Sequence, residues 1–210
     1  MLIDCFISTL DLTPNRIEWS RETIVAFLKE PSLRIVVIDA GSSQEQLEWF
    51  HQKGLTVVPQ PYDGSVHRRF LLAEALAQSE FFIFADNDVV PITENWLSAG
   101  LEVMRTHPKF GWLCYRLENT DFSSDNGFED SDVRTVRWGG GCAIIRRDAR
   151  THPFTVPFVF DPNNADDRSY CEAIRRSGWM VGQLLRQYVR HIGRSESSAW
   201  GRSDHFFQRS

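Results

Sequence analysis

An acidic residue, a polar residue and a second acidic residue follow the most apolar stretch of the sequence. Residues 81–85 are Phe-Phe-Ile-Phe-Ala, and Asp86, Asn87 and Asp88 come next. The apolar run predicts a buried β-strand, and ligands of open α/β sheets bind beyond the carboxyl ends of the strands. Two carboxylates in that position could share one divalent cation and the groups that it bridges. A solvated turn with Asn87 in the left-handed conformation is the alternative, and the position after a buried strand favours the metal site.

Another acidic residue, Asp39, follows the β-branched residues 35–38 and precedes Gly41, Ser42 and Ser43. A carboxylate at a strand end could accept hydrogen bonds from a base or a ribose, and the small residues would let a ligand approach the backbone. No Gly-x-Gly-x-x-Gly follows, so a dinucleotide site has little support. Ser42 or Ser43 could also cap the next helix, and the two roles are compatible.

An acidic pair, Asp166 and Asp167, opens a segment with helical periodicity. Asp167, Tyr170, Cys171 and Ile174 are spaced i, i+3, i+4 and i+7, which places Asp167 on the inward face and Asp166 about 100° away. An inward carboxylate is costly unless it is paired or has a chemical function. Helix capping is the alternative for both residues. We expect a function for Asp167 and capping for Asp166.

One of the six histidines has a context that suggests a metal site. His191 follows a predicted strand at residues 180–185. An imidazole near the paired carboxylates would complete a mixed nitrogen and oxygen site for a cation. The other five histidines are assigned to surface or packing roles.

Strands and helices alternate in the segments that must position these residues. The apolar runs are continuous rather than alternating, which is typical of a parallel sheet buried on both faces. We therefore expect right-handed βαβ units, an α/β fold and a central, mostly parallel sheet flanked by helices. The predicted strands span residues 3–9, 35–38, 55–58 and 81–85, and the predicted helices span residues 19–28, 44–52 and 67–77.

The regular alternation loosens in the second half of the sequence. Leu97, Gly100, Leu101 and Met104 form one stripe of a predicted helix. The polar residues 118–132 predict a long loop, which in a compact domain is more often a functional flap than a linker. Further strands are expected near residues 111–116, after the glycines at 139–141 and at 180–185, with a helix at residues 166–178.

Composition and charge limit the classes of function. The 210 residues are 42% hydrophobic and 24% charged, which is typical of one globular domain with a sizeable core. Because 23 basic and 28 acidic residues give a net charge of −5, binding to nucleic acid or to an anionic membrane is not expected. No apolar run is long enough for a membrane helix, and the start of the chain lacks the features of a secretory signal, so we expect a cytoplasmic protein. The scattered cysteines are expected to be reduced core residues: Cys5, Cys114, Cys142 and Cys171.

Taken in order, these motifs resemble the GT-A-fold glycosyltransferases of the family-2 type. The resemblance runs from about Ile3 to Ser195 and implies a GT-A-like, Rossmann-type single domain over residues 1–195. Its nucleotide-binding half would be residues 1–90, its acceptor half residues 91–195, and residues 196–210 would be a C-terminal tail or lid. The motifs that carry the resemblance are Asp39-Ala40-Gly41-Ser42, the acidic-x-acidic Asp86-Asn87-Asp88, the glycines Gly139-Gly140-Gly141, the doublet Asp166-Asp167, and His191-Ile192-Gly193.

The resemblance implies that the first half binds a nucleotide-sugar donor. Asp39 would contact the base, and Asp86 would approach the ribose or a metal ion. Asp88 would coordinate Mn²⁺ or Mg²⁺, and His191 would be a further contact to the metal or to the diphosphate. The remaining donor-side residues would be Ser8 and Thr9 at the edge of the base pocket, Asn87 within the acidic motif, and Arg69, which precedes that motif in a different register from the family's Arg-Asn-x-Gly.

On the acceptor side, the resemblance implies that Gly140 and Gly141 line the site and that Asp167 is the general base. The doublet is Asp-Asp here, where Glu-Asp is commoner in the family, and the proposed base is kept. A similar acidic cluster at residues 129–132 precedes the glycines and is interpreted as solvated surface. The implied activity is metal-dependent transfer of a sugar from a nucleotide sugar, with a UDP-sugar favoured, to a carbohydrate or other hydroxyl acceptor, with inversion at the anomeric carbon.

Two other functions are compatible with the same motifs. One is a nucleotide-sugar-binding protein that has lost transfer, and the intact Asp167 argues against it. The other is a nucleotidyltransferase on a similar sheet. The sequence has no glycine-rich, basic loop near its N-terminus to hold a triphosphate, which argues against this alternative.

Overall fold

Strands and helices alternate along the chain. The computed structural model describes residues 2–11, 13–60, 67–117, 124–150 and 166–193. In chain order the elements are β1 (Ile3–Thr9), α1 (Pro14–Phe27), β2 (Leu33–Asp39), α2 (Gln44–Gln52), β3 (Thr56–Pro59), α3 (His67–Leu76), β4 (Phe81–Asp86), β5 (Val89–Pro91), α4 (Trp96–Thr106), β6 (Phe110–Cys114), β7 (Ser124–Glu129), β8 (Val133–Val136), β9 (Cys142–Arg146), α5 (Asp166–Arg176), β10 (Met180–Leu184) and β11 (Val189–His191).

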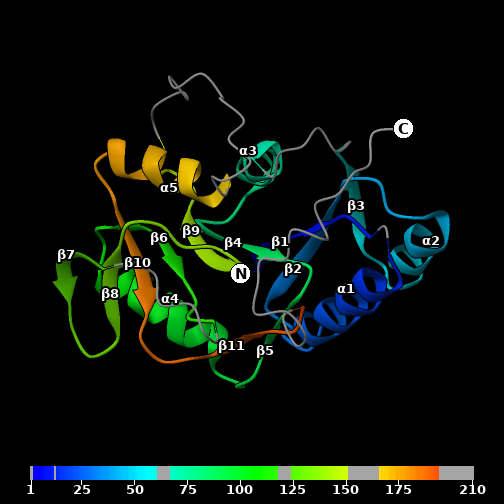
Figure 1. The fold of residues 1–210 in the computed structure, drawn as a ribbon, viewed down its shortest axis with the longest axis horizontal. Helices are drawn as coiled ribbons and strands as arrows, with labels where there is room; N and C mark the ends of the chain where they lie inside the picture. Colours follow the sequence, from blue (N-terminus) through cyan, green and yellow to red (C-terminus); the bar gives the residue numbers. More distant parts are fainter. Residues whose placement is uncertain (1, 12, 61–66, 118–123, 151–165, 194–210) are drawn as a thin grey trace.

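Nine of the strands form one sheet in the order β3-β2-β1-β4-β9-β6-β10-β8-β7 (Figure 1). The first four strands are parallel, and β6 and β10 are parallel to each other. Strand β9 lies antiparallel between β4 and β6, and β8 pairs antiparallel with both β10 and β7. The sheet is thus mixed but largely parallel, and the expected α/β class is confirmed.

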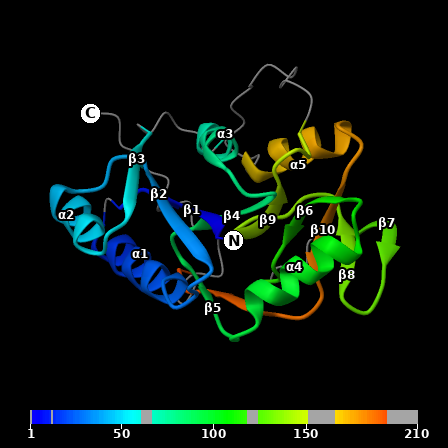
Figure 2. The ribbon, with the colours of Figure 1, turned by 180° about the vertical axis from the view of Figure 1, so that it is seen from behind.

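Helices cover both faces of this sheet (Figure 1 and Figure 2). Helices α1, α2 and α4 pack on one face, where Phe27, Phe50 and Met104 are completely buried. Helices α3 and α5 pack on the other face, where the ring centroids of Phe70 and Tyr170 are 5.1 Å apart. Burying each such side chain contributes about 1.5–3 kcal/mol. Because both faces are covered, the central strands are apolar on both sides.

Capping residues determine where the first two helices begin. The predicted helix at residues 19–28 begins five residues earlier, at Pro14. Thr13 accepts a backbone hydrogen bond from the first turn at 3.4 Å, and proline is pre-organised for this position. Helix α2 has the predicted bounds, and Ser43 is its N-cap, as one of the alternatives for that loop anticipated.

The polar region that we expected to be a loop contains a strand, so that expectation is wrong for residues 124–129. Residues 130–132 form the turn that follows, and residues 118–123 of the predicted loop lie outside the described residues. Strand β7 pairs with β8 as a hairpin at the edge of the sheet. Asp130 holds the turn, because its carboxylate accepts hydrogen bonds from the backbone N–H groups of Asp132 and Val133 at 2.8 and 2.9 Å. An edge strand can be short and charged, which is why its composition resembles that of a loop. Glu129 and Asp132 are exposed, as expected for solvated surface.

A second, two-stranded sheet pairs β5 with β11 in antiparallel orientation. Neither strand is predicted from the sequence, because three residues are too few to show a period. The pairing returns the chain from β10 to the end of β4, and it therefore joins the last described strand to the acidic motif.

The four cysteines are buried free thiols, as expected. Burial raises the pKa of each thiol well above its usual value, which keeps them protonated and unreactive. Within the described ranges, no helix combines the length and the apolar composition needed to cross a membrane.

Candidate functional site

The carboxyl ends of β1, β2 and β4 lie at one edge of the sheet. Their parallel register places Thr9 beside Asp39 and Ser8 beside Asp86. Asp86 is the last residue of β4, and its backbone N–H donates to the carbonyl oxygen of Gly141 at 2.8 Å. This edge therefore collects the predicted donor-side residues and brings the predicted acceptor-side glycines next to them.

Asp88 and His191 are brought together by the small β5–β11 sheet. The register pairs His191 with Val89, and the backbone N–H of Ile192 donates to the carbonyl oxygen of Asp88 at 2.7 Å. The imidazole Nε2 of His191 lies 3.2 Å from Oδ2 of Asp88. The expected proximity of His191 to the acidic motif is confirmed.

Asp167 lies in the first turn of α5, where it contacts Gly140. Tyr170, Cys171 and Ile174, which share its face of the helix, are buried, so the predicted orientation of α5 is confirmed. A methyl group on Gly140 would overlap the Asp167 carboxylate and would lie 3.2 Å from its Cβ atom. Only glycine fits at this position while Asp167 keeps its place.

Two further glycines lie near the other two carboxylates. A methyl group on Gly193 would overlap the carboxylate of Asp88. On Gly141, whose φ is +78°, it would lie 2.6 Å from Cδ1 of Leu117 and 3.9 Å from Oδ2 of Asp86. A glycine thus lies next to each of the three carboxylates, and at Gly140 and Gly193 a side chain would displace the neighbouring carboxylate.

The three carboxylates influence one another electrostatically. Burial raises the pKa of Asp86 well above its usual value, and the negative charges of Asp167 and Asp88 raise it further. The positive charge of Arg69 opposes this rise. Arg69 is only 5% exposed and donates a hydrogen bond to the hydroxyl of Ser8. A buried acid with a raised pKa, beside two further acids and one buried arginine, can hold a proton or help to hold a cation, and such groups are typical of functional sites.

The donor atoms fit a divalent cation that is shared with a bound phosphate group. Among the residues that the structure describes, no three His, Cys, Asp or Glu side chains are grouped to hold a metal ion by themselves. Asp88 and His191 provide one oxygen and one nitrogen donor in contact. Mg²⁺ is usually held by one or two carboxylates together with substrate phosphates, and carboxylates also suit Mn²⁺. The predicted cation therefore needs a bound diphosphate to complete its ligands.

The Asp39 carboxylate shapes the loop after β2. It accepts hydrogen bonds from the backbone N–H of Gly41 at 3.0 Å and from the hydroxyl of Thr9 at 3.0 Å. It also accepts from Ser42, through the backbone N–H at 3.1 Å and through the hydroxyl. These bonds use most of the acceptor capacity of a carboxylate. The predicted contact of Asp39 with a base stays a prediction.

A further buried acid, Asp11, joins the site from the loop after β1 and is not among the residues predicted from the sequence. It is 1% exposed. Its Oδ1 accepts from Nδ2 of Asn87 at 2.8 Å, and its Oδ2 accepts from Nε2 of Gln46 at 2.9 Å. Burial raises the pKa of Asp11 to about 6, hydrogen bonds from neighbouring side chains oppose the rise, and the charge of Asp39 adds to it. The sequence feature that could have indicated Asp11 is its position as an acidic residue two places beyond the first predicted strand.

Two predictions about the site fall on parts of the chain outside the described residues. Helix α5 begins at Asp166, but the side chain of Asp166, and hence its predicted capping role, lies outside them. The same holds for residues 196–210, the predicted tail or lid.

The fold has counterparts among solved structures, although no protein-family model and no curated protein matches the sequence. S. aureus TarS 1-349 matches with a TM-score of 0.67 at 16% identity, over 91% of this chain and 60% of that chain. S. aureus TarS matches with a TM-score of 0.66 at 16% identity, over 91% and 37% of the two chains. TarS 1-349 in complex with UDP-GlcNAc matches with a TM-score of 0.62 at 14% identity, over 94% and 62%.

These matches show the fold. TarS has the GT-A fold of family-2 glycosyltransferases, so the expected resemblance is confirmed at the level of the fold. The chain spans 60% of the length of TarS 1-349 and 37% of the longer TarS chain.

Proposed function

We propose that this protein is a metal-dependent glycosyltransferase that moves a sugar from a UDP-sugar to an acceptor hydroxyl with inversion at the anomeric carbon. The observation that carries the proposal is the gathering of Asp86, Asp88 and Asp167 around the end of β4, with His191 against Asp88. The UDP-GlcNAc bound to TarS 1-349 in the complex described above supports the choice of donor. In this proposal residues 1–90 bind the nucleotide and residues 91–195 bind the acceptor.

Asp88 and His191 are the proposed protein ligands of Mn²⁺ or Mg²⁺. When bound, the ion supplies Lewis-acid stabilisation of the negative charge that develops on the leaving diphosphate. Asp86 approaches the ribose or the ion. The positive charge of Arg69 acts on Asp86 and partly offsets the negative charge of the carboxylates, so an anionic diphosphate can approach them at a smaller electrostatic cost.

Asp167 is the proposed general base. The proton of the acceptor hydroxyl moves to the Asp167 carboxylate while the hydroxyl oxygen forms its bond to the anomeric carbon. The bond from that carbon to the diphosphate oxygen breaks in the same step and its electron pair leaves with the diphosphate. A positioned carboxylate typically contributes about 10²–10⁴-fold to the rate. Gly140 provides the space in which the Asp167 carboxylate lies.

Release of UDP from UDP-GlcNAc and other UDP-hexoses, with Mn²⁺ or Mg²⁺ and with water as the acceptor, tests the proposal. Asp167→Asn is expected to slow release by at least about 100-fold with little change in the Kd for UDP. Asp88→Asn is expected to weaken UDP binding that depends on the metal. Asp132→Asn, which changes an exposed acid in the β7–β8 turn, is the matched control and is expected to retain both properties.

The outcomes separate the three candidate functions. UDP binding without release from any UDP-sugar would favour a nucleotide-sugar-binding protein. Pyrophosphate release from a nucleoside triphosphate and a sugar phosphate would favour a nucleotidyltransferase. Full activity of Asp167→Asn would contradict the assignment of the base.

A further inference from the structure

Four polar side chains connect the surface of α1 with the acidic motif. Nε of Arg21 donates to Oε1 of Gln46 at 2.9 Å, and Nε2 of Gln46 donates to Oδ2 of Asp11 at 2.9 Å. On the other side of Asp11, Nδ2 of Asn87 donates to Oδ1 at 2.8 Å. Gln46 and Asp11 are 0% and 1% exposed. The connection therefore passes through the interior, from α1 through α2 and the loop after β1 to the turn after β4.

Hydrogen-bonding chemistry fixes the direction of each of these bonds. A guanidinium only donates and an ionised carboxylate only accepts, whereas an amide donates from its nitrogen and accepts at its oxygen. Arg21 therefore requires the oxygen of Gln46, which turns the Gln46 nitrogen toward Asp11. Asp11 in turn requires the nitrogen of Asn87, so the Asn87 oxygen lies on the opposite edge of that amide.

We infer that Asp11 is a positioning residue that, together with Gln46 and Arg21, orients the Asn87 amide so that its oxygen is offered to the bound donor. The inference rests on the proposed function for the identity of that donor, a UDP-sugar whose ribose hydroxyls can donate to the oxygen. Burial raises the pKa of Asp11 to about 6, which leaves the carboxylate largely ionised, and hence an acceptor, at neutral pH. The same bond anchors the turn that carries the acidic motif.

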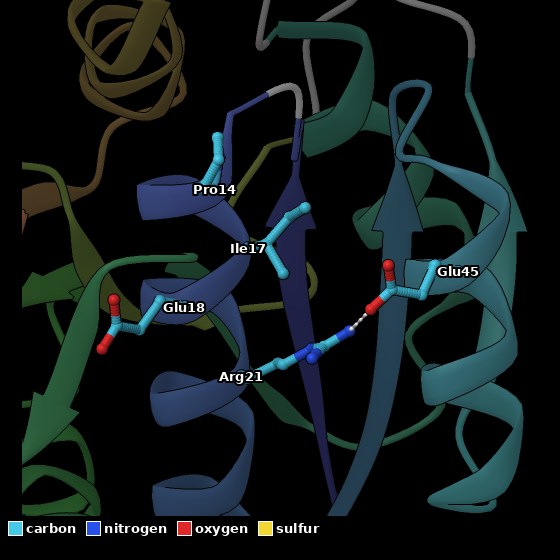
Figure 3. A pocket seen from close by; sticks show the side chains of 5 residues that line it. All are labelled: Pro14, Ile17, Glu18, Arg21 and Glu45. Carbon is cyan, nitrogen blue, oxygen red and sulfur yellow. Dashed lines mark hydrogen bonds and ion pairs between the residues drawn. The ribbon is translucent and has the colours of Figure 1, made fainter.

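The outer end of the connection lies at a surface hollow between α1 and α2. Figure 3 shows Arg21 reaching from α1 to Glu45 of α2, and their Nη2 and Oε1 atoms are 3.1 Å apart. Pro14, Ile17 and Glu18 line the same hollow. The side chain of Arg21 is 32% exposed, so Arg21 can be shortened without opening a cavity in the core.

Asp11→Asn tests the inference because the new amide accepts at one edge and donates at the other. Either Gln46 or Asn87 must then turn its own amide. Arg21 holds Gln46 in place, so Asn87 turns and offers its nitrogen to the donor. Adding Arg21→Ala releases Gln46, which can then turn, and Asn87 regains its original orientation.

Calorimetric titration with UDP in Mn²⁺ measures the consequence. Asp11→Asn is expected to raise the Kd for UDP by about 3- to 10-fold, the range for one lost hydrogen bond. Asp11→Asn with Arg21→Ala is expected to return to within about twofold of Arg21→Ala alone. In an Asn87→Ala background, Asp11→Asn is expected to have no further effect. Asp4→Asn is the matched control, since Asp4 is 2% exposed near the other end of β1, and it is expected to lower the Tm without raising the Kd.

Side-chain amide NMR signals provide a readout that needs no ligand. The Asn87 signal, assigned by its loss in Asn87→Ala, is expected to shift in Asp11→Asn and to return toward its original position when Arg21→Ala is added. Asn87→Asp, at the partly exposed end of the connection, is the second variant should Asp11→Asn fail to fold. In this variant two carboxylates, those of residues 11 and 87, face each other with no donor between them, and the Kd for UDP is expected to rise at least tenfold.

Two results would overturn the inference and leave the proposed function intact. In the first, the Asn87 signal does not shift in folded Asp11→Asn. In the second, neither Asp11→Asn nor Asn87→Asp changes the Kd for UDP. If the wild type binds neither UDP nor a UDP-sugar but the Asn87 signal responds as expected, the proposed function fails and the orienting role of Asp11 is supported.

Discussion

Replacing Gly140 by alanine displaces the Asp167 carboxylate without changing any charged group. The added methyl group would overlap Oδ2 of Asp167 and would lie 3.2 Å from its Cβ atom, so the side chain must rotate away. Helix α5 cannot move as a unit at low cost, because Tyr170 and Ile174 are buried on the same face. A base removed from the acceptor hydroxyl loses a contribution of about 10²–10⁴-fold. This corresponds to about 2.7–5.4 kcal/mol of activation free energy at about 1.36 kcal/mol per factor of ten.

Steady-state release of UDP from UDP-GlcNAc measures the effect. We expect Gly140→Ala to lower kcat by at least about 100-fold, and to leave the Kd for UDP in Mn²⁺ nearly unchanged, since the three atoms nearest to the new methyl group all belong to Asp167. Gly54→Ala is the matched control. Its methyl group meets no atom within 4 Å, but its φ of +71° costs a side chain about 1–2 kcal/mol, so it lowers the Tm and leaves kcat unchanged. A folded Gly140→Ala variant with the wild-type kcat would show that the position of the Asp167 carboxylate does not limit the reaction.

Three other perturbations follow from the buried acids and from the proposed metal site. Burial by itself raises the pKa of Asp4, but hydrogen bonds from two backbone N–H groups and from Arg34 bring it below the ordinary 3.8. The ionised Asp4 therefore stabilises the folded protein fully above about pH 4, and this stabilisation is lost at lower pH. The Tm of the wild type should fall more steeply below pH 4 than the Tm of Asp4→Asn. Parallel Tm curves for the two proteins would contradict this prediction. The effect of Asp11 on stability has the opposite pH dependence, because folding raises its pKa from 3.8 to about 6. As the pH rises from about 4 to about 6, the wild type should lose up to about 3 kcal/mol of unfolding free energy relative to Asp11→Asn. Urea unfolding of both proteins at pH 4 and pH 7 measures this loss, and an equal difference between them at the two pH values would contradict the prediction. Chelation of divalent cations should raise the Kd for UDP at least tenfold, and His191→Ala should raise it in the same direction; titrations that do not respond to chelator would contradict the proposed ligands.

The central part of the fold could be predicted because continuous apolar runs in the sequence indicate strands that are buried on both faces. Strands β2 and β4 are continuous apolar runs, as expected where helices cover both faces of a sheet. The bounds of α2 follow from the capping Ser43 and from Gly54 just beyond its end. The start of α1 was missed because Thr13 and Pro14, a cap followed by a proline, outweigh the weak apolar periodicity of its first turns.

The edges of the fold could not be predicted, because the signals there are weak. Strand β7 has the sequence Ser-Asp-Asn-Gly-Phe-Glu and forms only through its pairing with β8 at the edge of the sheet. Strands β5 and β11 have three residues each and depend on each other. Both features are decided by tertiary pairing rather than by local pattern.

The candidate site was predicted where its residues stand at strand ends or on a helix face. The acidic motif after β4 and the inward Asp167 are examples, and His191 was singled out by its position after a strand. The contact of Gly140 with Asp167 joins residues that are 27 positions apart, and no local spacing encodes it. Asp11 was missed for the same reason, since its function in the site depends on partners from α2 and from the turn after β4.

Early-time proton NMR of UDP-GlcNAc cleavage is the sharpest test of the proposed single displacement, because it reports bond breaking and stereochemistry together. UDP-GlcNAc carries an α-linked sugar, and a single displacement in which Asp167 removes the proton of the attacking hydroxyl or water predicts the β-anomer as the first product in the presence of Mn²⁺. The α-anomer as the first product would contradict inversion, and cleavage that continues at the same rate in Asp167→Asn would contradict the role of Asp167 as the base.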